Sequence, residues 1–235
     1  LLLHYLFLRS DLEIICWMQR HKTNDALISN SGKSFMDLPA GSVIGTSSIR
    51  RRSQVLSLRK DLSIKLLRGN VDTRIQKLKN HEYDAVILSL AGLTRLNLDH
   101  LVTEVLEHNL FLPAACQGAV GVQALKSSEV KKILAPINDL KTQTECMAER
   151  RVLKNINANC NSPVSIYANI NENNISLKFE MFDHQGNKIF KTSKEDLKEN
   201  YFKLCDELGE EIINVVGQTK INELDNLKSD FNYTH

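Results

Sequence analysis

The stretch from Gly45 to Arg52, Gly-Thr-Ser-Ser-Ile-Arg-Arg-Arg, narrows the choice of folds more than any other part of this chain. The apolar residues before it are typical of a strand end, and Ile49 to Arg59 has the apolar spacing of a helix. Gly45 allows a sharp turn between them, and Ser47 or Ser48 is a suitable N-cap. Free N–H groups in a first helical turn attract anions, whereas three arginines there oppose the helix dipole. The stretch therefore predicts an anion-binding turn, or else a capped surface helix with solvated arginines.

The same order of strand, glycine turn and basic helix occurs a second time. A predicted strand over Ser63 to Leu67 leads into Arg68-Gly69-Asn70 and a helix from about Asp72 to Lys79, which carries Arg74. Ala85 to Leu88 is a near-continuous apolar run, as in a buried parallel strand. This alternation predicts an α/β domain with a mainly parallel sheet. Because ligands bind beyond the carboxyl ends of such strands, we expect the basic residues to converge there.

After about residue 138 the alternation of single strands and helices ends, and the pattern predicts a small α+β domain. Three strands of an antiparallel sheet, joined by turns rich in Asn, Asp and Gly, are expected over residues 164–170, 175–182 and 188–192. A charged helix precedes them, with Thr142 and Glu145 spaced as a capping box. An amphipathic helix over residues 196–216 follows, with Leu197 on its apolar side. The polar tail from Gln218 is expected to fray.

Composition limits the possible function classes. The 235 residues are enough for one large or two ordinary domains, and a net charge of only +2 gives no reason to expect a nucleic-acid partner. The 5 cysteines are far apart without a Cys-x-x-Cys pair, and the 7 histidines are scattered. We therefore expect neither a disulfide framework nor a metal site. The apolar run from Leu1 to Leu8 is too short to span a bilayer and lacks the features of a signal peptide.

Several motifs occur in a fixed order, and each would be a weak signal alone. They are Leu38-Pro39-Ala40-Gly41, Gly45 to Arg51, Leu67 to Val71 with Thr73-Arg74, Tyr83-Asp84-Ala85, Ala91-Gly92-Leu93, Leu112-Pro113-Ala114 with Gln117-Gly118-Ala119, and Asn159 to Pro163 with Tyr167-Ala168. From about Leu12 to the C-terminal helix, their order and spacing resemble the family of hydroxymethylbilane synthase, also called porphobilinogen deaminase.

This resemblance implies three domains, of which two are like periplasmic binding proteins and the third is a small α+β unit. It implies a transferase of heme and other porphyrin (tetrapyrrole) biosynthesis that condenses four porphobilinogen units head to tail and releases ammonia at each step. The product grows on a dipyrromethane cofactor held by a thioether to a cysteine that aligns with Cys160. The implied partners are porphobilinogen and the growing polypyrrole chain. We expect a monomer in the cytoplasm or a plastid, without nucleic acid or membrane.

The resemblance also divides the chain. We expect a remnant of domain 1 over residues 1–21, domain 2 over 22–117, a segment returning to domain 1 over 118–138, domain 3 over 139–220, and a tail over 221–235. The family's N-terminal Arg-x-Ser segment and its Lys-Asp motif, which supplies the catalytic aspartate, do not occur at the expected place. We therefore expect no catalytic residue in this chain, and we interpret it as an N-terminally truncated form that does not catalyse the reaction.

Carboxylate chemistry agrees with the implied site. Each pyrrole carries an acetate and a propionate, so the growing chain needs fixed cations that do not deprotonate, which favours Arg over Lys. A thiol such as that of Cys160 is a good acceptor for the electrophilic species that deamination produces. By resemblance, the cofactor-binding residues are Cys160, which is attached covalently, and Thr46, Ser47, Ser48, Arg50, Arg51, Arg68, Gly69, Arg74, Gln117 and Gly118.

Two other interpretations remain open. A non-catalytic anion-binding module of the periplasmic-binding-protein class would account for residues 25–113, but it leaves the loop around Cys160 and the second domain unexplained. A relic that keeps the fold without the chemistry would account for the missing aspartate. A covalent dipyrromethane adduct, detected by mass spectrometry, would distinguish the enzyme from both.

Overall fold

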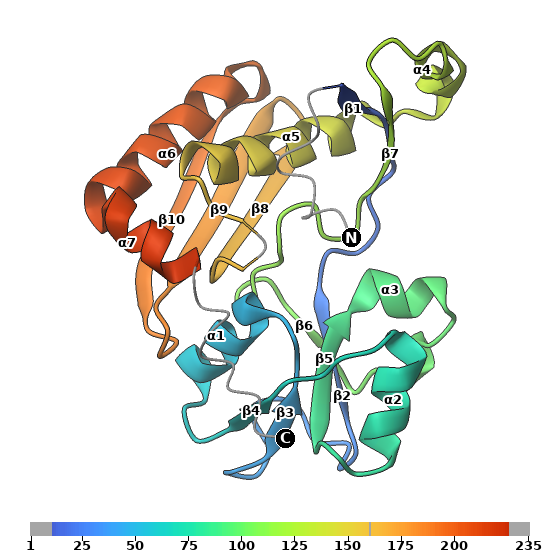
Figure 1. The fold of residues 1–235 in the computed structure, drawn as a ribbon, viewed down its shortest axis with the longest axis vertical. Helices are drawn as coiled ribbons and strands as arrows, with labels where there is room; N and C mark the ends of the chain where they lie inside the picture. The colour runs from blue at the N-terminus through green and yellow to red at the C-terminus, as the bar shows by residue number, and fades with distance from the viewer. Residues whose placement is uncertain (1–10, 160, 226–235) are drawn as a thin grey trace.

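The computed structural model describes residues 11–159 and 161–225, which form three sheets with helices packed against them (Figure 1). The apolar run Leu1 to Leu8 lies outside the described residues. The strands are β1 (Leu12–Met18), β2 (Asp25–Ser29), β3 (Val43–Gly45), β4 (Ser63–Lys65), β5 (Ala85–Ser89), β6 (Glu104–Leu106), β7 (Val120–Leu125), β8 (Val164–Asn171), β9 (Asn174–Phe182) and β10 (Lys188–Leu197). The α-helices are α1 (Ile49–Leu58), α2 (Val71–Lys79), α3 (Leu90–Arg95), α4 (Val130–Leu134), α5 (Leu140–Asn155), α6 (Tyr201–Val216) and α7 (Gln218–Asp225).

The largest sheet is mixed, with strand order β4-β3-β5-β2-β6. Strand β3 is parallel to β4 and β5, as expected, but β2 is antiparallel to both of its neighbours, β5 and β6. The expectation of a mainly parallel sheet therefore holds only for the β4-β3-β5 half. A short, buried apolar strand such as β2 has the same residue pattern in either direction, so its direction could not be inferred.

Both faces of the central strands β5 and β2 of this sheet are buried. Along β5, Val86 and Leu88 pack with residues of α2 and α3, whereas Ala85 and Ile87 pack on the opposite face with Val55 of α1. Because both faces are covered, β5 is apolar without alternation, which explains the continuous run seen in the sequence. Helix α1 thus covers one face of the sheet, and α2 and α3 cover the other.

The second sheet is antiparallel, in the order β10-β9-β8, and confirms the predicted three-stranded sheet. Its buried face packs against α5 and α6, where Phe179 and Leu208 are fully buried (Figure 1). Strand β10 continues to Leu197, and α6 begins only at Tyr201. The prediction that Leu197 lies on the apolar side of a helix is therefore wrong. Leu197 pairs with Asn174 at the strand end and is 45% exposed.

Two further predictions about helices are wrong. Thr142 and Glu145 do not form a capping box, because α5 begins earlier and its N-cap is Asp139, which accepts from the Thr142 N–H at 2.7 Å. The sequence after Gln218 is not frayed throughout, because α7 covers Gln218–Asp225. Its Ile221 and Leu224 are each 1% exposed and belong to the same core as α5 and α6.

Strands β1 and β7 form a separate antiparallel pair, shown beside α4 in Figure 1. Two segments connect this pair with the largest sheet, one over residues 19–24 and one over residues 107–119. They touch each other, because the His21 N–H donates to the Gly118 carbonyl at 3.0 Å. Among the described residues, no helix combines the length and apolar character needed to cross a bilayer.

The packing of α7 gives a test of this part of the fold. Replacing Ile221 by Ala removes a buried side chain and should reduce the free energy of unfolding by about 2–5 kcal/mol. Replacing the neighbouring exposed Lys220 by Ala should change it by less than about 0.5 kcal/mol. Urea denaturation of both variants measures the difference, and equal midpoints would mean that α7 contributes nothing to the core.

Candidate functional site

The turn before α1 is stabilised by its own hydroxyl groups. Ser48 is the N-cap, and its Oγ accepts from the Arg51 N–H at 3.4 Å. Thr46 is buried, and its Oγ1 accepts from the Ser48 N–H at 3.1 Å, whereas Ser47 is exposed. Gly45 is needed for packing rather than for a sharp turn, because a Cβ there would lie 2.8 Å from the Tyr83 ring. Of the three hydroxyl residues, Ser47 alone is left exposed for a ligand.

Arg50 and Arg51 share one buried carboxylate. Arg50 Nη2 donates to Asp25 Oδ2 at 2.7 Å, and Arg51 donates to Asp25 Oδ1 from Nη2 at 2.8 Å and from Nε at 3.0 Å. Asp25 is fully buried, and Arg50 is only 5% exposed. Burial alone would raise the pKa of Asp25, but the two guanidinium groups outweigh it and hold that pKa below its ordinary value. We expected both arginines to bind ligand carboxylates, and in this structure the carboxylate that they bind is that of Asp25.

Gln117 joins this network from the connecting segment. Its Nε2 donates to Asp25 Oδ1 at 2.9 Å and to the Thr23 carbonyl at 2.6 Å, and its Oε1 accepts from Arg50 Nη2 at 3.3 Å. The backbone carbonyl of Leu112 also accepts from Arg50 Nη1 at 2.8 Å. The network therefore links α1, β2 and the second connecting segment, and it brings together three of the predicted site residues, Arg50, Arg51 and Gln117.

Arg68, Gly69 and Arg74 lie beyond the carboxyl end of β4. Arg74 Nε donates to the Gly69 carbonyl at 2.8 Å, and Arg68 is exposed. Partial burial and then the positive charge of Arg51 lower the pKa of Arg74, so these two guanidinium groups are close enough to repel each other. A ligand carboxylate between them would relieve that repulsion.

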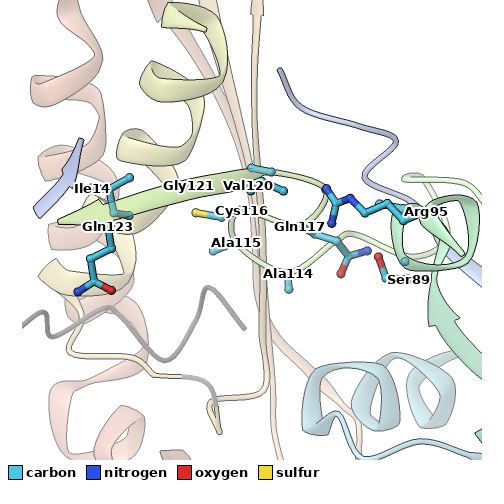
Figure 2. A pocket seen from close by; sticks show the side chains of 14 residues that line it. Ile14, Ser89, Arg95, Ala114, Ala115, Cys116, Gln117, Val120, Gly121 and Gln123 are labelled. Carbon is cyan, nitrogen blue, oxygen red and sulfur yellow. The ribbon is translucent and has the colours of Figure 1, made fainter. Parts of the chain in front are cut away.

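A pocket of about 540 Å³ lies between α3 and the second connecting segment, and strands β1 and β7 line its other side. Figure 2 shows Arg95, Ser89 and Gln117 gathered at one end of this pocket and Gln123 at the other. Arg95 was not predicted as a site residue, although it follows Ala91-Gly92-Leu93 after a buried strand, which was a usable signal. The pocket brings a further exposed arginine next to Gln117 and Gly118, two of the predicted site residues.

Arg20 fastens the connecting segments to α5. Its Nη1 and Nη2 donate to the two carboxylate oxygens of Glu149 at 2.9 and 3.2 Å, and its Nε donates to the Gln117 carbonyl at 3.0 Å. Gly118 has a φ of +83°, and a Cβ there would lie 2.7 Å from the His21 carbonyl oxygen. The two segments therefore run too close for a side chain at Gly118, which gives this predicted residue a packing role.

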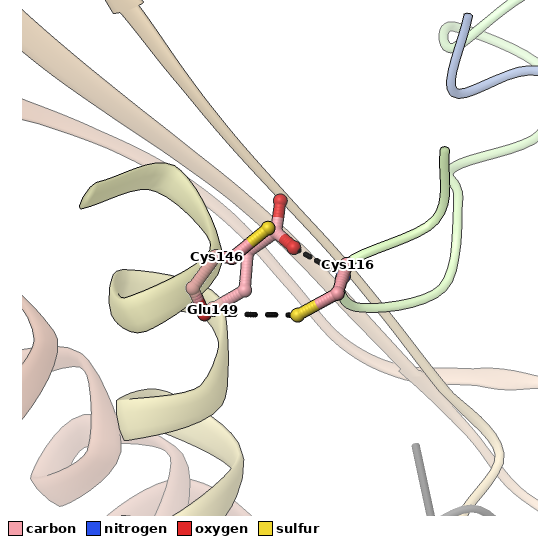
Figure 3. A group of neighbouring side chains, drawn as sticks. All are labelled: Cys116, Cys146 and Glu149. Atoms are coloured by element: carbon pink, nitrogen blue, oxygen red, sulfur yellow. Dashed lines mark hydrogen bonds between the residues drawn. The ribbon is translucent and has the colours of Figure 1, made fainter. Parts of the chain in front are cut away.

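Cys116, Cys146 and Glu149 form a buried group whose donor atoms lie within 4.8 Å of one another (Figure 3). Both carboxylate oxygens of Glu149 are occupied, since they accept from Arg20, from the Cys116 N–H and from the Ala168 N–H. The Cys116 thiol and burial raise the pKa of the Cys146 thiol, which keeps it protonated. This arrangement is that of a structural junction, because the Cys146 thiol is held protonated and both Glu149 oxygens are bound by N–H groups of the protein.

Cys160 lies outside the described residues, but the residues around it form a defined turn. The Asn159 N–H donates to Ser162 Oγ at 2.7 Å, and the Asn161 N–H donates to Asn159 Oδ1 at 2.8 Å. The turn leads directly into β8, since the Pro163 carbonyl accepts from the Phe182 N–H at 3.0 Å. The predicted loop at the start of the antiparallel sheet is thus present on both sides of Cys160.

Two family models match the chain. Residues 6–132 match the model described as "Porphobilinogen deaminase, dipyromethane cofactor binding domain", and residues 143–214 match "Porphobilinogen deaminase, C-terminal domain". The first match covers the largest sheet, α1 and the pocket. The second covers most of α5, the antiparallel sheet and most of α6.

Curated relatives carry the same name. The chain is 40% identical over 203 residues to a porphobilinogen deaminase of Clostridium kluyveri, covering 86% of this chain and 69% of that one. It is 39% identical over 199 residues to one of Campylobacter jejuni subsp. doylei, covering 84% and 64%. A Bacillus mycoides relative is 43% identical over 164 residues, covering 69% and 53%. The chain thus spans between about half and two thirds of the length of these relatives, and it belongs to the porphobilinogen deaminase family.

Proposed function

We propose that this protein is a hydroxymethylbilane synthase, which condenses four porphobilinogen units head to tail and releases ammonia at each step. The observation that carries the proposal is the placement of three arginines: Arg68 and Arg74 lie beyond β4, where Arg74 is close to Arg51 of α1, and Arg95 lines the pocket beside Gln117. These arginines offer guanidinium groups to a ligand that carries many carboxylates.

The chemistry of these donor groups fits a dipyrromethane cofactor, whose two pyrroles carry acetate and propionate side chains. Arg68, Arg74 and the exposed hydroxyl of Ser47 would hold carboxylates beyond β3 and β4, and Arg95 would hold others in the pocket. When bound, the cofactor supplies the pyrrole carbon to which the first substrate unit is joined. The side chains named here bind and orient carboxylates.

Arg50 and Arg51 have a supporting part in this proposal. The two guanidinium groups share one carboxylate, so the network keeps a net charge of about +1 near the first turn of α1. Because Asp25 is fully buried, this charge is screened less by solvent than a surface charge would be. Asp25 therefore fixes the position of both arginines and leaves part of their charge to attract the ligand.

We further propose, from the resemblance, that the thiol of Cys160 anchors the cofactor through a thioether. The other four cysteines are buried: Cys16, Cys116, Cys146 and Cys205. Burial raises the pKa of Cys205 to about 12, and Cys146 is shifted in the same direction. Among the described thiols these two are therefore poorly suited to act as nucleophiles near neutral pH.

Arginine substitutions test the binding part of the proposal. Arg68→Leu and Arg74→Leu each remove a charged hydrogen-bonding group, which should cost roughly 1.5–3 kcal/mol of binding, or about ten- to a hundredfold in affinity for porphobilinogen. Arg151→Leu, on α5 and paired with Asp206, removes the same charge elsewhere and should leave the affinity unchanged. Calorimetric titration measures all three. Equal affinities would return Arg68 and Arg74 to the role of solvated surface residues.

Intact-mass spectrometry tests the anchor. Two proteins are incubated with porphobilinogen: the 235-residue chain, and the same chain extended upstream by a segment with the Lys-Asp motif. In the extended chain we expect porphobilinogen consumption and a pyrrole adduct, and Cys160→Ser should carry none. An adduct on Cys160→Ser would refute the anchor. Anion binding with an unmodified thiol and no consumption would favour the non-catalytic module.

Asp25→Asn tests the support of the two arginines. Removing one partner of a buried pair should cost about 3–5 kcal/mol of stability at pH 7. Since the folded-state pKa of Asp25 is lowered, its contribution is complete above the ordinary Asp value of about 3.9 and is lost as the pH falls below it. Urea unfolding at pH 7 and pH 3 should therefore show a gap between wild type and variant that narrows at the lower pH. A gap that stays constant would contradict this assignment.

A further inference from the structure

The turn between β9 and β10 packs directly against α1, which lies on another sheet (Figure 1). Arg52 Nη1 donates to the His184 carbonyl at 3.0 Å. Just after the helix, Lys60 Nζ donates to Asn187 Oδ1 at 3.0 Å. Two cationic side chains of the basic helix region therefore bind the hairpin of the antiparallel sheet.

Gly186 brings the two backbones into contact. Its φ is +80°, and a Cβ there would lie 2.6 Å from Leu56 Cβ, 2.9 Å from the Ser53 carbonyl oxygen and 3.0 Å from the Ser57 nitrogen. Two of these three atoms belong to the α1 backbone, which cannot rotate away as a flexible side chain could. Any side chain at Gly186 would thus shift either the helix or the turn.

The turn is itself well ordered by hydrogen bonds. Asp183 Oδ1 accepts from the N–H groups of Gln185 and Asn187 at 2.9 and 2.8 Å, and Asp183 Oδ2 accepts from Asn187 Nδ2 at 2.8 Å. The Gly186 N–H donates to the Asp183 carbonyl at 3.2 Å. A turn held in this way presents a fixed surface to the helix.

The contact between the turn and α1 contains two buried polar atoms that do not contribute to stability. Ser53 Oγ on α1 and His184 Nδ1 on the turn are both buried, and neither has a hydrogen-bond partner in the described part of the chain. Unpaired buried polar atoms are unfavourable, so keeping them at such a contact calls for a reason. The opposite side of α1 is held by the bonds of Arg50 and Arg51 to Asp25. The helix is therefore fixed from two sides, by the sheet beneath it and by the turn.

We propose that the turn from Asp183 to Gly186 positions α1 for ligand binding, with Arg52 as a positioning residue and the exposed Ser47 at the binding end of the helix. This inference rests on the proposed function for the identity of the ligand. The turn sets where the first helical turn lies relative to Arg68 and Arg74. The turn thereby influences the carboxylate site through α1, without contacting the ligand itself.

Gly186→Ala tests the positioning, with Gly41→Ala as the matched control. Gly41 has nearly the same φ, +82°, but a Cβ there would meet nothing within 4 Å, so both variants carry the backbone strain and only one displaces α1. A misplacement of a positioning group by 1 Å can reduce an enzyme's rate about a hundredfold. We therefore expect that a shift of α1 by a few tenths of an ångström weakens porphobilinogen affinity about three- to tenfold. Hydrogen exchange of the α1 amides should become faster in Gly186→Ala and stay unchanged in Gly41→Ala.

Arg52 supplies a second test that introduces no steric clash. Arg52→Leu should weaken porphobilinogen affinity in the same direction, and Arg52→Lys should restore part of it, because lysine can still donate to the His184 carbonyl. Equal α1 exchange and affinity in Gly186→Ala and Gly41→Ala would overturn the proposal, as would affinity losses that merely follow thermal stability in both. If the wild-type chain does not bind porphobilinogen, the proposed function fails, and the exchange of α1 still decides whether the turn positions the helix.

Discussion

The buried carboxylate of Asp25 is the interaction on which the candidate site depends. It accepts hydrogen bonds from Arg50, Arg51 and Gln117, which come from α1 and from a connecting segment. An unpaired carboxylate in this position would be strongly unfavourable, and two unpaired guanidinium groups would be equally so. Each charge therefore makes the burial of the others possible, and the first turn of α1 can carry Arg50 and Arg51 although they oppose its dipole.

A second buried ion pair ties this region to the antiparallel sheet. Arg20 binds Glu149 through both terminal nitrogens, and Glu149 also accepts from the backbone of Cys116 and of Ala168 in β8. The loop that contains Cys160 leads into the same strand, β8. The residues that would hold carboxylates and strand β8, which follows the loop with the proposed cofactor residue, are thus parts of one connected framework, joined through Arg20 and through the contact of Gly186 with α1.

Local residue patterns predicted most helices and strands, but not how every strand pairs in the largest sheet. Strand β5, α1 with a serine cap, for which Ser47 and Ser48 were both candidates, and the three-stranded sheet follow from residue spacing and turn chemistry. The direction of β2 could not be inferred, because a buried apolar strand has the same pattern both ways.

The sequence also did not show which charged side chains are buried. Asp25 and Arg20 lie in a short polar stretch of the sequence, and only the partners brought together by the fold show that these two side chains are buried. For the same reason, the sequence did not reveal that an internal carboxylate lies within reach of both Arg50 and Arg51.

The central claim is that the arginines divide into two groups, with Arg50 and Arg51 held by Asp25 while Arg68, Arg74 and Arg95 face the ligand. Nuclear magnetic resonance of the arginine side-chain N–H groups, followed during titration with porphobilinogen, tests this division directly. We expect the Nε–H signals of Arg68, Arg74 and Arg95 to shift until the protein is saturated, whereas those of Arg50 and Arg51 should stay nearly constant. Large shifts at Arg50 and Arg51, with none at the other three, would contradict it.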